Sequence, residues 1–99
     1  MQFGFSGVVW EWRGPAPFHF VSVPAEDAEE IRDAASRVSY GWGMIPVSAT
    51  IGATSFTTSL WPKNGSYVLP LKDAVRNAEG IELDDVIDVS FVLAPRRGR

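Results

Sequence analysis

Apolar and polar residues alternate along most of the chain, which is the pattern of strands that bury one face and expose the other. The clearest stretch is IPVSATI, where every second residue from Ile45 to Ile51 is apolar. Turn-forming residues separate the runs, among them Asn64 and Gly65, a pair that favours a tight hairpin. The pattern predicts six strands, at residues 3–12, 18–23, 45–51, 55–61, 66–69 and 86–93.

The first strand changes its pattern at Gly7. Phe3 and Phe5 lie on one parity, whereas Trp10 and Trp12 lie on the other. One extra residue in a strand moves all later side chains to the opposite face. We therefore expect a β-bulge at Gly7, which would bring the phenylalanines and the tryptophans to the same face.

Two helices are predicted, each beginning at a proline. Pro24 and Pro70 each follow a strand-like run, and proline has no N–H for a central ladder but has the φ angle of a first helical turn. Apolar residues then recur at helical spacing. The residues expected to face the core are Ala28, Ile31, Ala35 and Val38 in the first helix, at residues 24–38, and Leu71, Ala74, Val75 and Ala78 in the second, which Gly80 ends.

The segments VSVPAEDA and YVLPLKDA are alike and lie 46 residues apart, close to half of the 99-residue chain. We infer two similar halves, each a strand, a strand and a helix. Six strands in one small open sheet would leave exposed edges, so a closed or split arrangement is favoured. The predicted fold class is mainly β with two short helices, a double-split six-stranded β-barrel over residues 1–95, followed by a basic tail at residues 96–99.

Composition restricts the location and the cofactors. The chain has no cysteine, which excludes disulfides and thiolate metal sites. The N-terminal MQFGFSGVVWEW lacks the basic and apolar regions of a secretory signal, and no stretch approaches about 18 apolar residues. We expect a cytoplasmic protein with no membrane partner.

The charge of the chain is unevenly distributed. Three of the nine cationic residues, Arg96, Arg97 and Arg99, lie in the last four positions. Nine minus three leaves six cations against twelve Asp and Glu residues, so residues 1–95 carry a formal net charge of -6. Since nucleic-acid binders gain affinity by neutralising phosphates with Lys and Arg, a nucleic-acid partner is not expected.

The stretch LPLKDAVRNAEGIELDDVIDV resembles the strand, proline, helix, glycine and acidic-turn signature of the swapped-hairpin domains in bacterial transition-state regulators and antitoxins. The whole chain resembles a small bacterial family described only as a domain of unknown function, with VSVP, IPVSATIGATSFTTSLWP, GSYVLPLKDAVR and DDVIDVSFVL in the expected order. The resemblance implies a double-split β-barrel and brings no activity, substrate or catalytic residue.

Two features differ from the swapped-hairpin domains. Those domains are dimers of half-length chains, whereas the repeat here lets one chain complete its own barrel. We therefore expect a monomer and leave a weak dimer open. Asp84 stands where the motif usually has glycine, so the turn before Asp85 is expected to differ locally.

Residues that would support catalysis or metal binding are few. His19 is the only histidine, so a transition-metal site lacks ligands, and we expect a structural or surface role for it and no cofactor. No serine lies in a nucleophile motif such as G-x-S-x-G. Ser55, Thr57 and Ser59 fit the solvent face of a strand, and Asp84 and Asp85 fit a solvated turn. No catalytic residue is assigned.

Four tryptophans in 99 residues are the most suggestive feature, because so many indoles do not all fit in a small core. One interpretation is that they cap the ends of the barrel. The other is a groove that binds an unknown small molecule or protein, with candidate residues Trp10, Trp12, Arg13, Trp42 and Lys63, and a candidate anion site at Lys72 and Arg76.

The leading functional hypothesis is therefore a non-catalytic ligand- or protein-binding module. The first alternative is a DNA-binding regulator that resembles the swapped-hairpin proteins, which the acidic body disfavours. The second is a small enzyme, which would need a pocket and a catalytic base that the sequence does not show.

Overall fold

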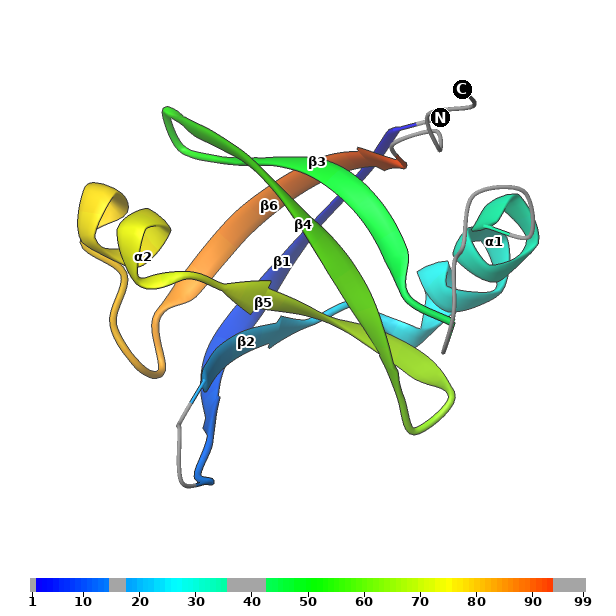
Figure 1. Cartoon of the computed structure of the whole chain (residues 1–99), viewed down its shortest axis with the longest axis horizontal. Helices are drawn as coiled ribbons and strands as arrows, with labels where there is room; N and C mark the ends of the chain where they lie inside the picture. The colour runs from blue at the N-terminus through cyan, green and yellow to red at the C-terminus, as the bar shows by residue number, and fades with distance from the viewer. Residues whose placement is uncertain (1, 15–17, 36–42, 94–99) are drawn as a thin grey trace.

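The computed structural model describes residues 2–14, 18–35 and 43–93. Each half of the chain runs strand, strand, helix, strand (Figure 1). The elements are β1 (Gln2–Trp12), β2 (Phe18–Ser22), α1 (Ala25–Ala35), β3 (Ile45–Ile51), β4 (Thr54–Lys63), β5 (Ser66–Leu71), α2 (Asp73–Glu79) and β6 (Val86–Leu93). The predicted mainly β class with six strands and two short helices is confirmed.

The strands close into one antiparallel barrel in the order β1-β2-β5-β4-β3-β6. Two long strands, β1 and β4, each pair with two neighbours in succession. Residues 2–8 of β1 pair with β6 and residues 9–12 pair with β2. Residues 54–60 of β4 pair with β3 and residues 61–63 pair with β5. The two halves therefore build the barrel by the same pairing scheme.

The barrel core is formed by the inward positions that the alternation predicts. In β3 and β6 these are Ile45, Val47, Ala49, Ile51, Ile87, Val89 and Phe91, all buried. The ring of Phe3 stacks on that of Phe91 with centroids 5.2 Å apart, and Phe5 meets Phe91 edge-on at 6.2 Å. Aromatic pairs of this kind add about 0.5–1.5 kcal/mol beyond the area they bury.

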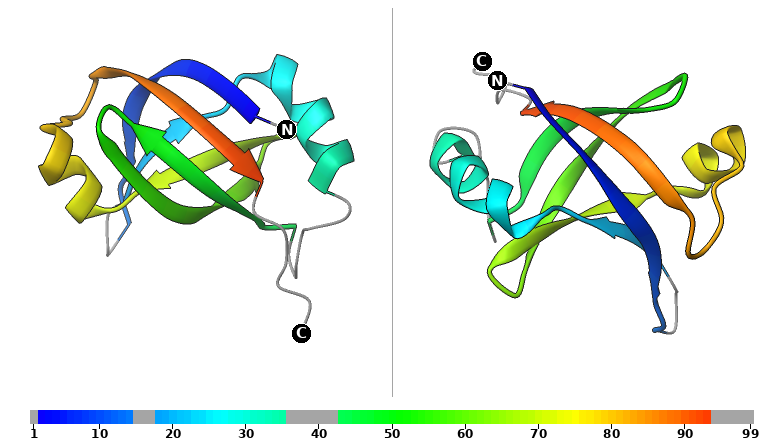
Figure 2. Two further views of the ribbon diagram at one scale, coloured as in Figure 1. Left: turned by 90° about the horizontal axis from the view of Figure 1, so that it is seen from above. Right: turned by 180° about the vertical axis from the view of Figure 1, so that it is seen from behind.

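The two helices close opposite ends of the barrel (Figure 2). Helix α1 buries Ile31, and Arg32 Nη2 donates a 2.7 Å hydrogen bond to the carbonyl of Gly65 in the β4–β5 turn. Helix α2 buries Val75, and Glu79 Oε2 accepts a 2.5 Å hydrogen bond from Thr54 Oγ1 after the β3–β4 turn. Each helix is thus fastened to a hairpin, α1 to the β4–β5 hairpin and α2 to the β3–β4 hairpin. Neither described helix is long and apolar enough to cross a membrane.

Pro24 directly precedes α1, but the position predicted for Pro70 is wrong. Pro70 lies inside β5, buried and opposite Phe20, and α2 begins only at Asp73 with Lys72 as its N-cap. The missing N–H of Pro70 toward β4, rather than the start of the helix, explains this proline, as shown below. Residues 36–38 of the first predicted helix and the tail at residues 96–99 lie outside the described residues.

Helix α2 covers the barrel with a smaller face than its pattern predicts. Val75 is buried, but Ala74 and Ala78 are exposed, so their predicted core positions are wrong. The helix has only seven residues and turns a single apolar side chain inward. Gly80 ends it in the left-handed region, with φ 63°, as predicted.

The turns behave as their residues predict. Asn64 and Gly65 both have positive φ, 51° and 81°, as a two-residue hairpin requires. Asp84 has φ 72°, in the left-handed region that glycine favours. Asp85 Oδ2 accepts a 2.8 Å hydrogen bond from the amide of Glu82, so this carboxylate shapes the turn.

The bulge expected at Gly7 does not form. The pairing of β1 with β6 passes through Gly7 and Ile87 one residue at a time, so parity is kept and Val9 is fully buried. A Cβ at Gly7 would lie 2.6 Å from Val21 Cγ2. Gly7 is thus an inward position without room for a side chain. The consequence is that Trp10 and Trp12 lie on the outside of the barrel.

Replacing Gly7 by alanine should destabilise the protein by about 1–3 kcal/mol, because the added methyl overpacks the contact with Val21. Gly4→Ala is the matched control in the same strand, since its Cβ would meet nothing closer than the carbonyl of Val89 at 3.7 Å. Urea unfolding of both variants measures the difference. Equal stabilities would contradict the inward placement of Gly7.

Candidate functional site

Aromatic side chains gather on the outer face of the sheet formed by β1, β2, β5 and β4. Opposed residues of an antiparallel pair point to the same face. The register places Trp10 opposite Phe20 and Trp12 opposite Phe18, and Trp61 of β4 lies on the same outer face two strands away. Three tryptophans that are far apart in sequence therefore share one surface.

These rings form a second hydrophobic cluster, separate from the barrel core. Phe20 is only 3% exposed, although it points away from the barrel interior. Trp10 stacks on it with centroids 5.1 Å apart, and Trp61 meets it edge-on at 5.2 Å. Phe18 contacts Trp61 at 6.0 Å. Phe20 is therefore buried by its aromatic neighbours rather than by the core.

A groove of about 280 Å³ opens over this cluster, and we call it the aromatic groove. Lys63 Nζ lies 5.7 Å from the centroid of the Trp10 ring, close enough for a cation–π interaction. Trp10 Nε1 donates a 2.9 Å hydrogen bond to Ser22 Oγ, which orients the indole. The groove is lined by Trp10, Trp12, Phe18, Phe20, Trp61, Pro62, Lys63 and Val68.

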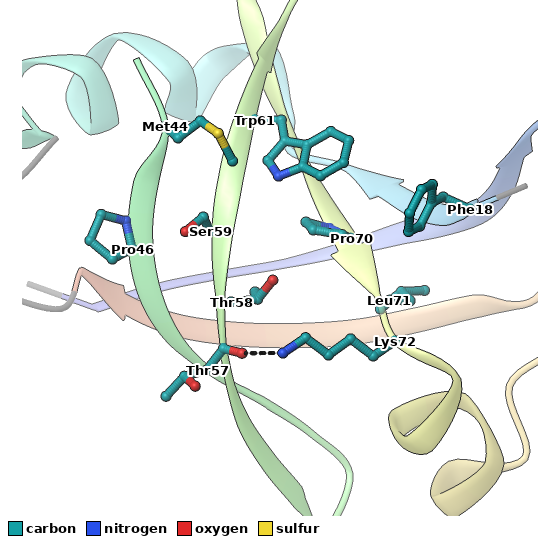
Figure 3. A pocket seen from close by; sticks show the side chains of 10 residues that line it. All are labelled: Phe18, Met44, Pro46, Thr57, Thr58, Ser59, Trp61, Pro70, Leu71 and Lys72. Carbon is teal, nitrogen blue, oxygen red and sulfur yellow. Dashed lines mark hydrogen bonds between the residues drawn. The ribbon is translucent and has the colours of Figure 1, made fainter. Parts of the chain in front are cut away.

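A second and larger groove of about 530 Å³ lies where β4 separates from β5, and we call it the split groove (Figure 3). Its walls are mostly apolar. Lys72 Nζ reaches across it and donates a 3.3 Å hydrogen bond to the carbonyl of Thr57. The lining residues are Phe18, Met44, Pro46, Thr57, Thr58, Ser59, Trp61, Pro70, Leu71 and Lys72, so Phe18 and Trp61 border both grooves.

Pro70 explains why the two strands separate. The amide of Val23 donates to the carbonyl of Tyr67, which marks a hydrogen-bonded pair between the β2 segment and β5. Such pairs alternate, so Val21 and Leu69 form the next one and the main-chain groups of Pro70 face β4. Proline has no N–H to donate there. The ladder between β4 and β5 accordingly ends at the pair of Trp61 and Val68, two residues before Pro70.

The structure brings three of the predicted ligand-binding residues together. Trp10, Trp12 and Lys63 line the aromatic groove, and their role in binding stays a prediction. The side chain of Arg13 is 83% exposed, with Nε 3.6 Å from Glu11 Oε1, and does not line the groove. Trp42 lies outside the described residues.

The two residues of the predicted anion site engage different partners. Lys72 lines the split groove and binds Thr57, whereas Arg76 Nη2 lies 2.8 Å from Asp73 Oδ1 in an ion pair. The charge of Arg76 is thus partly neutralised by its neighbour on the same helix. Anion binding at this pair stays a prediction.

His19 lies on the inward parity of Val21 and is half-buried opposite Leu71. Within the described ranges, no three His, Asp or Glu side chains come together as a group that would hold a metal ion. The described side chains that line the two grooves are aromatic rings, other apolar residues, three hydroxyl residues and two lysines.

Sequence reasoning missed the two phenylalanines of β2 and the place of Trp61. The signal was present in FHFVSV, where His19 and Val21 share one parity and Phe18 and Phe20 share the other. Large apolar residues on both parities of a short strand indicate that both of its faces are covered. The outer cover of β2 comes from tryptophans of other strands, which the pattern of β2 alone does not reveal.

The family model described as "Domain of unknown function (DUF1905)" matches residues 5–91 of the chain. The matched range contains every residue that lines the aromatic groove and the split groove. No curated protein matches the chain.

Phe20→Ala should lower the free energy of unfolding by about 3–5 kcal/mol, as for a core phenylalanine, although the ring lies outside the barrel. Phe18→Ala is the matched control two residues away, because its side chain is 45% exposed, and it should cost about 1 kcal/mol or less. Chemical denaturation monitored by circular dichroism compares the two. Similar small losses for both variants would show that the outer cluster is not tightly packed.

Proposed function

The chain belongs to the DUF1905 family, and from this premise we propose that it is a non-catalytic binding module whose ligand occupies the aromatic groove. The observation that carries the proposal is a hydrophobic cluster outside a complete core, with Trp12 49% and Phe18 45% exposed. Contiguous apolar surface of this kind is uncommon on monomeric proteins and marks interaction sites. The proposal takes the protein as a cytoplasmic monomer.

The opposite side of the barrel supports this interpretation. The outward positions over β1, β6 and β3 carry no aromatic ring; apart from Pro46 and three exposed valines, of which Val8 and Val86 lie opposite each other, they are small or polar. The outward polar residues are Gln2, Ser6, Ser48, Thr50, Asp88 and Ser90. The aromatic side chains are therefore concentrated on one face, which burial of the barrel core does not require.

The rings of the groove are held in place before any ligand arrives. Trp10 is fixed by its stack on Phe20 and by its hydrogen bond to Ser22. The indole of Trp12 lies so close to Gly14 that a Cβ there would be only 1.9 Å from the ring. Preorganised aromatic side chains lose little conformational entropy on binding. The arrangement suits recognition of a flat or apolar group.

The charge of the groove indicates the rest of the ligand. Lys63 lines the groove, none of the described residues that line it is a carboxylate, and residues 1–95 carry a net charge of -6. A cation placed beside rings on an acidic protein complements an anionic group on the ligand. We take the ligand to carry a planar or apolar ring together with a carboxylate or a phosphate.

The test uses 2-naphthoate and its neutral amide as probes in ¹H–¹⁵N NMR titrations that include the indole N–H signals. Trp10→Ala should weaken both probes, because it removes the stacking surface. Lys63→Met should weaken the binding of naphthoate about fivefold, because one exposed charge interaction contributes about 1 kcal/mol. The same substitution should leave the binding of the amide unchanged. Lys72→Met is the matched control, since Lys72 does not line this groove.

The absence of shifts in the groove at millimolar probe would overturn the proposal. So would a dimer in light scattering that Trp12→Ala converts to a monomer, because the aromatic face would then be a contact between two copies of the chain.

A further inference from the structure

The split groove carries its charge at one end. In Figure 3 Lys72 crosses the groove at the level of Thr57, whereas Met44 and Trp61 lie toward the other end. Thr57 and Trp61 are four residues apart on β4, which corresponds to about 13 Å of extended chain. Among the described residues that line the groove, Lys72 is the one cation and none is a carboxylate. The groove therefore suits a ligand with a charged head and a long apolar body.

The ammonium group of Lys72 is held in position without being neutralised. Its Nζ donates a 3.3 Å hydrogen bond to the carbonyl of Thr57, an uncharged acceptor. Within the described ranges no carboxylate forms an ion pair with Lys72, and the neighbouring Asp73 is paired with Arg76. An ammonium group has three N–H donors. The contact with Thr57 uses one of them, so two donors and the full charge remain for a ligand.

The walls beyond Lys72 are mainly aliphatic. Pro70 and Leu71 are buried residues of β5 and form a fixed wall. Met44 and Pro46 are half-buried on the side of β3, and a methionine side chain adapts to the shape of what it contacts. A volume of about 530 Å³ lies in the range of small-molecule sites. An unbranched aliphatic chain would be covered along most of its length.

The hydroxyl residues of the lining do not change this picture. All three belong to β4, so they form one side of the groove and leave the opposite wall apolar. They are Thr57, Thr58 and Ser59.

The single cation selects a carboxylate over a phosphate. A phosphate monoester carries a charge of about −1.5 to −2 and is typically bound by several donors or by the planar fork of an arginine. Arg76 does not line the groove, and Lys72 offers one positive charge. One lysine therefore matches the single charge of a carboxylate.

We propose that the split groove is a second ligand site, which binds an aliphatic monocarboxylate of medium chain length. The carboxylate lies at Lys72, and the chain extends along β4 toward Met44 and Trp61. Phe18 and Trp61 border both grooves, but Lys72 and the aliphatic wall belong to the split groove alone. The inference goes beyond the proposed function, which concerns a ring-bearing ligand in the aromatic groove.

The probe is octanoate, titrated below its micelle-forming concentration into the ¹⁵N-labelled full chain. It should shift the amides of Thr57 and Thr58 and the indole N–H of Trp61, and leave the indole N–H of Trp10 in place. Octanoate should bind at least about tenfold more tightly than butyrate, because the groove removes the additional methylene groups from water. Equal affinities would contradict a site for an aliphatic chain.

Substitution of Lys72 tests the position of the carboxylate. Lys72→Met should weaken the binding of octanoate about fivefold and should not weaken the binding of octanamide, which has no charge. Lys72→Arg keeps the charge and should keep the preference for octanoate over octanamide. Lys63→Met is the matched control at the aromatic groove, and it should change neither affinity.

A second pair of variants tests the position of the chain. Met44→Ala should weaken octanoate and octanamide alike, by about threefold, since it removes apolar wall and no charge. Trp12→Ala is the control, because Trp12 lines the aromatic groove and not the split groove. It should leave both affinities unchanged.

The outcomes separate this inference from the proposed function. If octanoate shifts the indole of Trp10 and responds to Lys63→Met rather than Lys72→Met, the aromatic groove accepts both kinds of ligand and the second site is wrong. If naphthoate fails to bind but octanoate binds with the expected dependence on Lys72, the proposed function fails and the second site stands. The absence of shifts at Thr57 and Thr58 with millimolar octanoate would overturn the inference. So would a dimer in light scattering that Met44→Ala converts to a monomer, because the groove would then hold a second copy of the chain.

Discussion

The unbroken register of β1 across Gly7 is the constraint on which the rest of the structure depends. In a strand, a shift of one residue turns every later side chain to the other face. Because Gly7 stays in the ladder and accommodates Val21, Val9 enters the core and Trp10 and Trp12 leave it. The continuous register of β1 therefore completes the core with Val9 and places the rings of Trp10 and Trp12 in the aromatic groove.

Alternation and turn residues were sufficient to predict the strands, the helices and the barrel, because those signals are local. The roles of one glycine and one proline were predicted wrongly, since each role depends on a neighbour that is distant in sequence. Gly7 is explained by Val21 rather than by a bulge, and Pro70 is explained by the edge of β4 rather than by α2. Gly7 matters because it lacks a Cβ, and Pro70 matters because it lacks an N–H. The role of such a residue can be recognised only when its neighbour in the fold is known.

The candidate site was predicted in part for a similar reason. The excess of tryptophan and the isolated lysine pointed to Trp10, Trp12 and Lys63, which the fold brings together. Phe18 was overlooked, because its contact with Trp61 joins strands that are distant in sequence. The split groove had no sequence signal at all, since a missing pair between two strands is a property of the sheet. Arg13 is the opposite case, because it follows Trp12 in the sequence but does not line the groove.

The two halves use one pairing scheme but differ where each long strand changes partner. In the first half, the space beside Gly7 is closed by Val21, so close that a single methyl would overlap. In the second half, Pro70 has no N–H to donate to β4, and a groove remains between the strands. Pro24 leads directly into α1, whereas Pro70 stays in β5 and delays α2 until Asp73. The two halves thus close one junction with a side chain and leave a groove at the other, and this groove adjoins the aromatic face, whose rings the barrel core does not need.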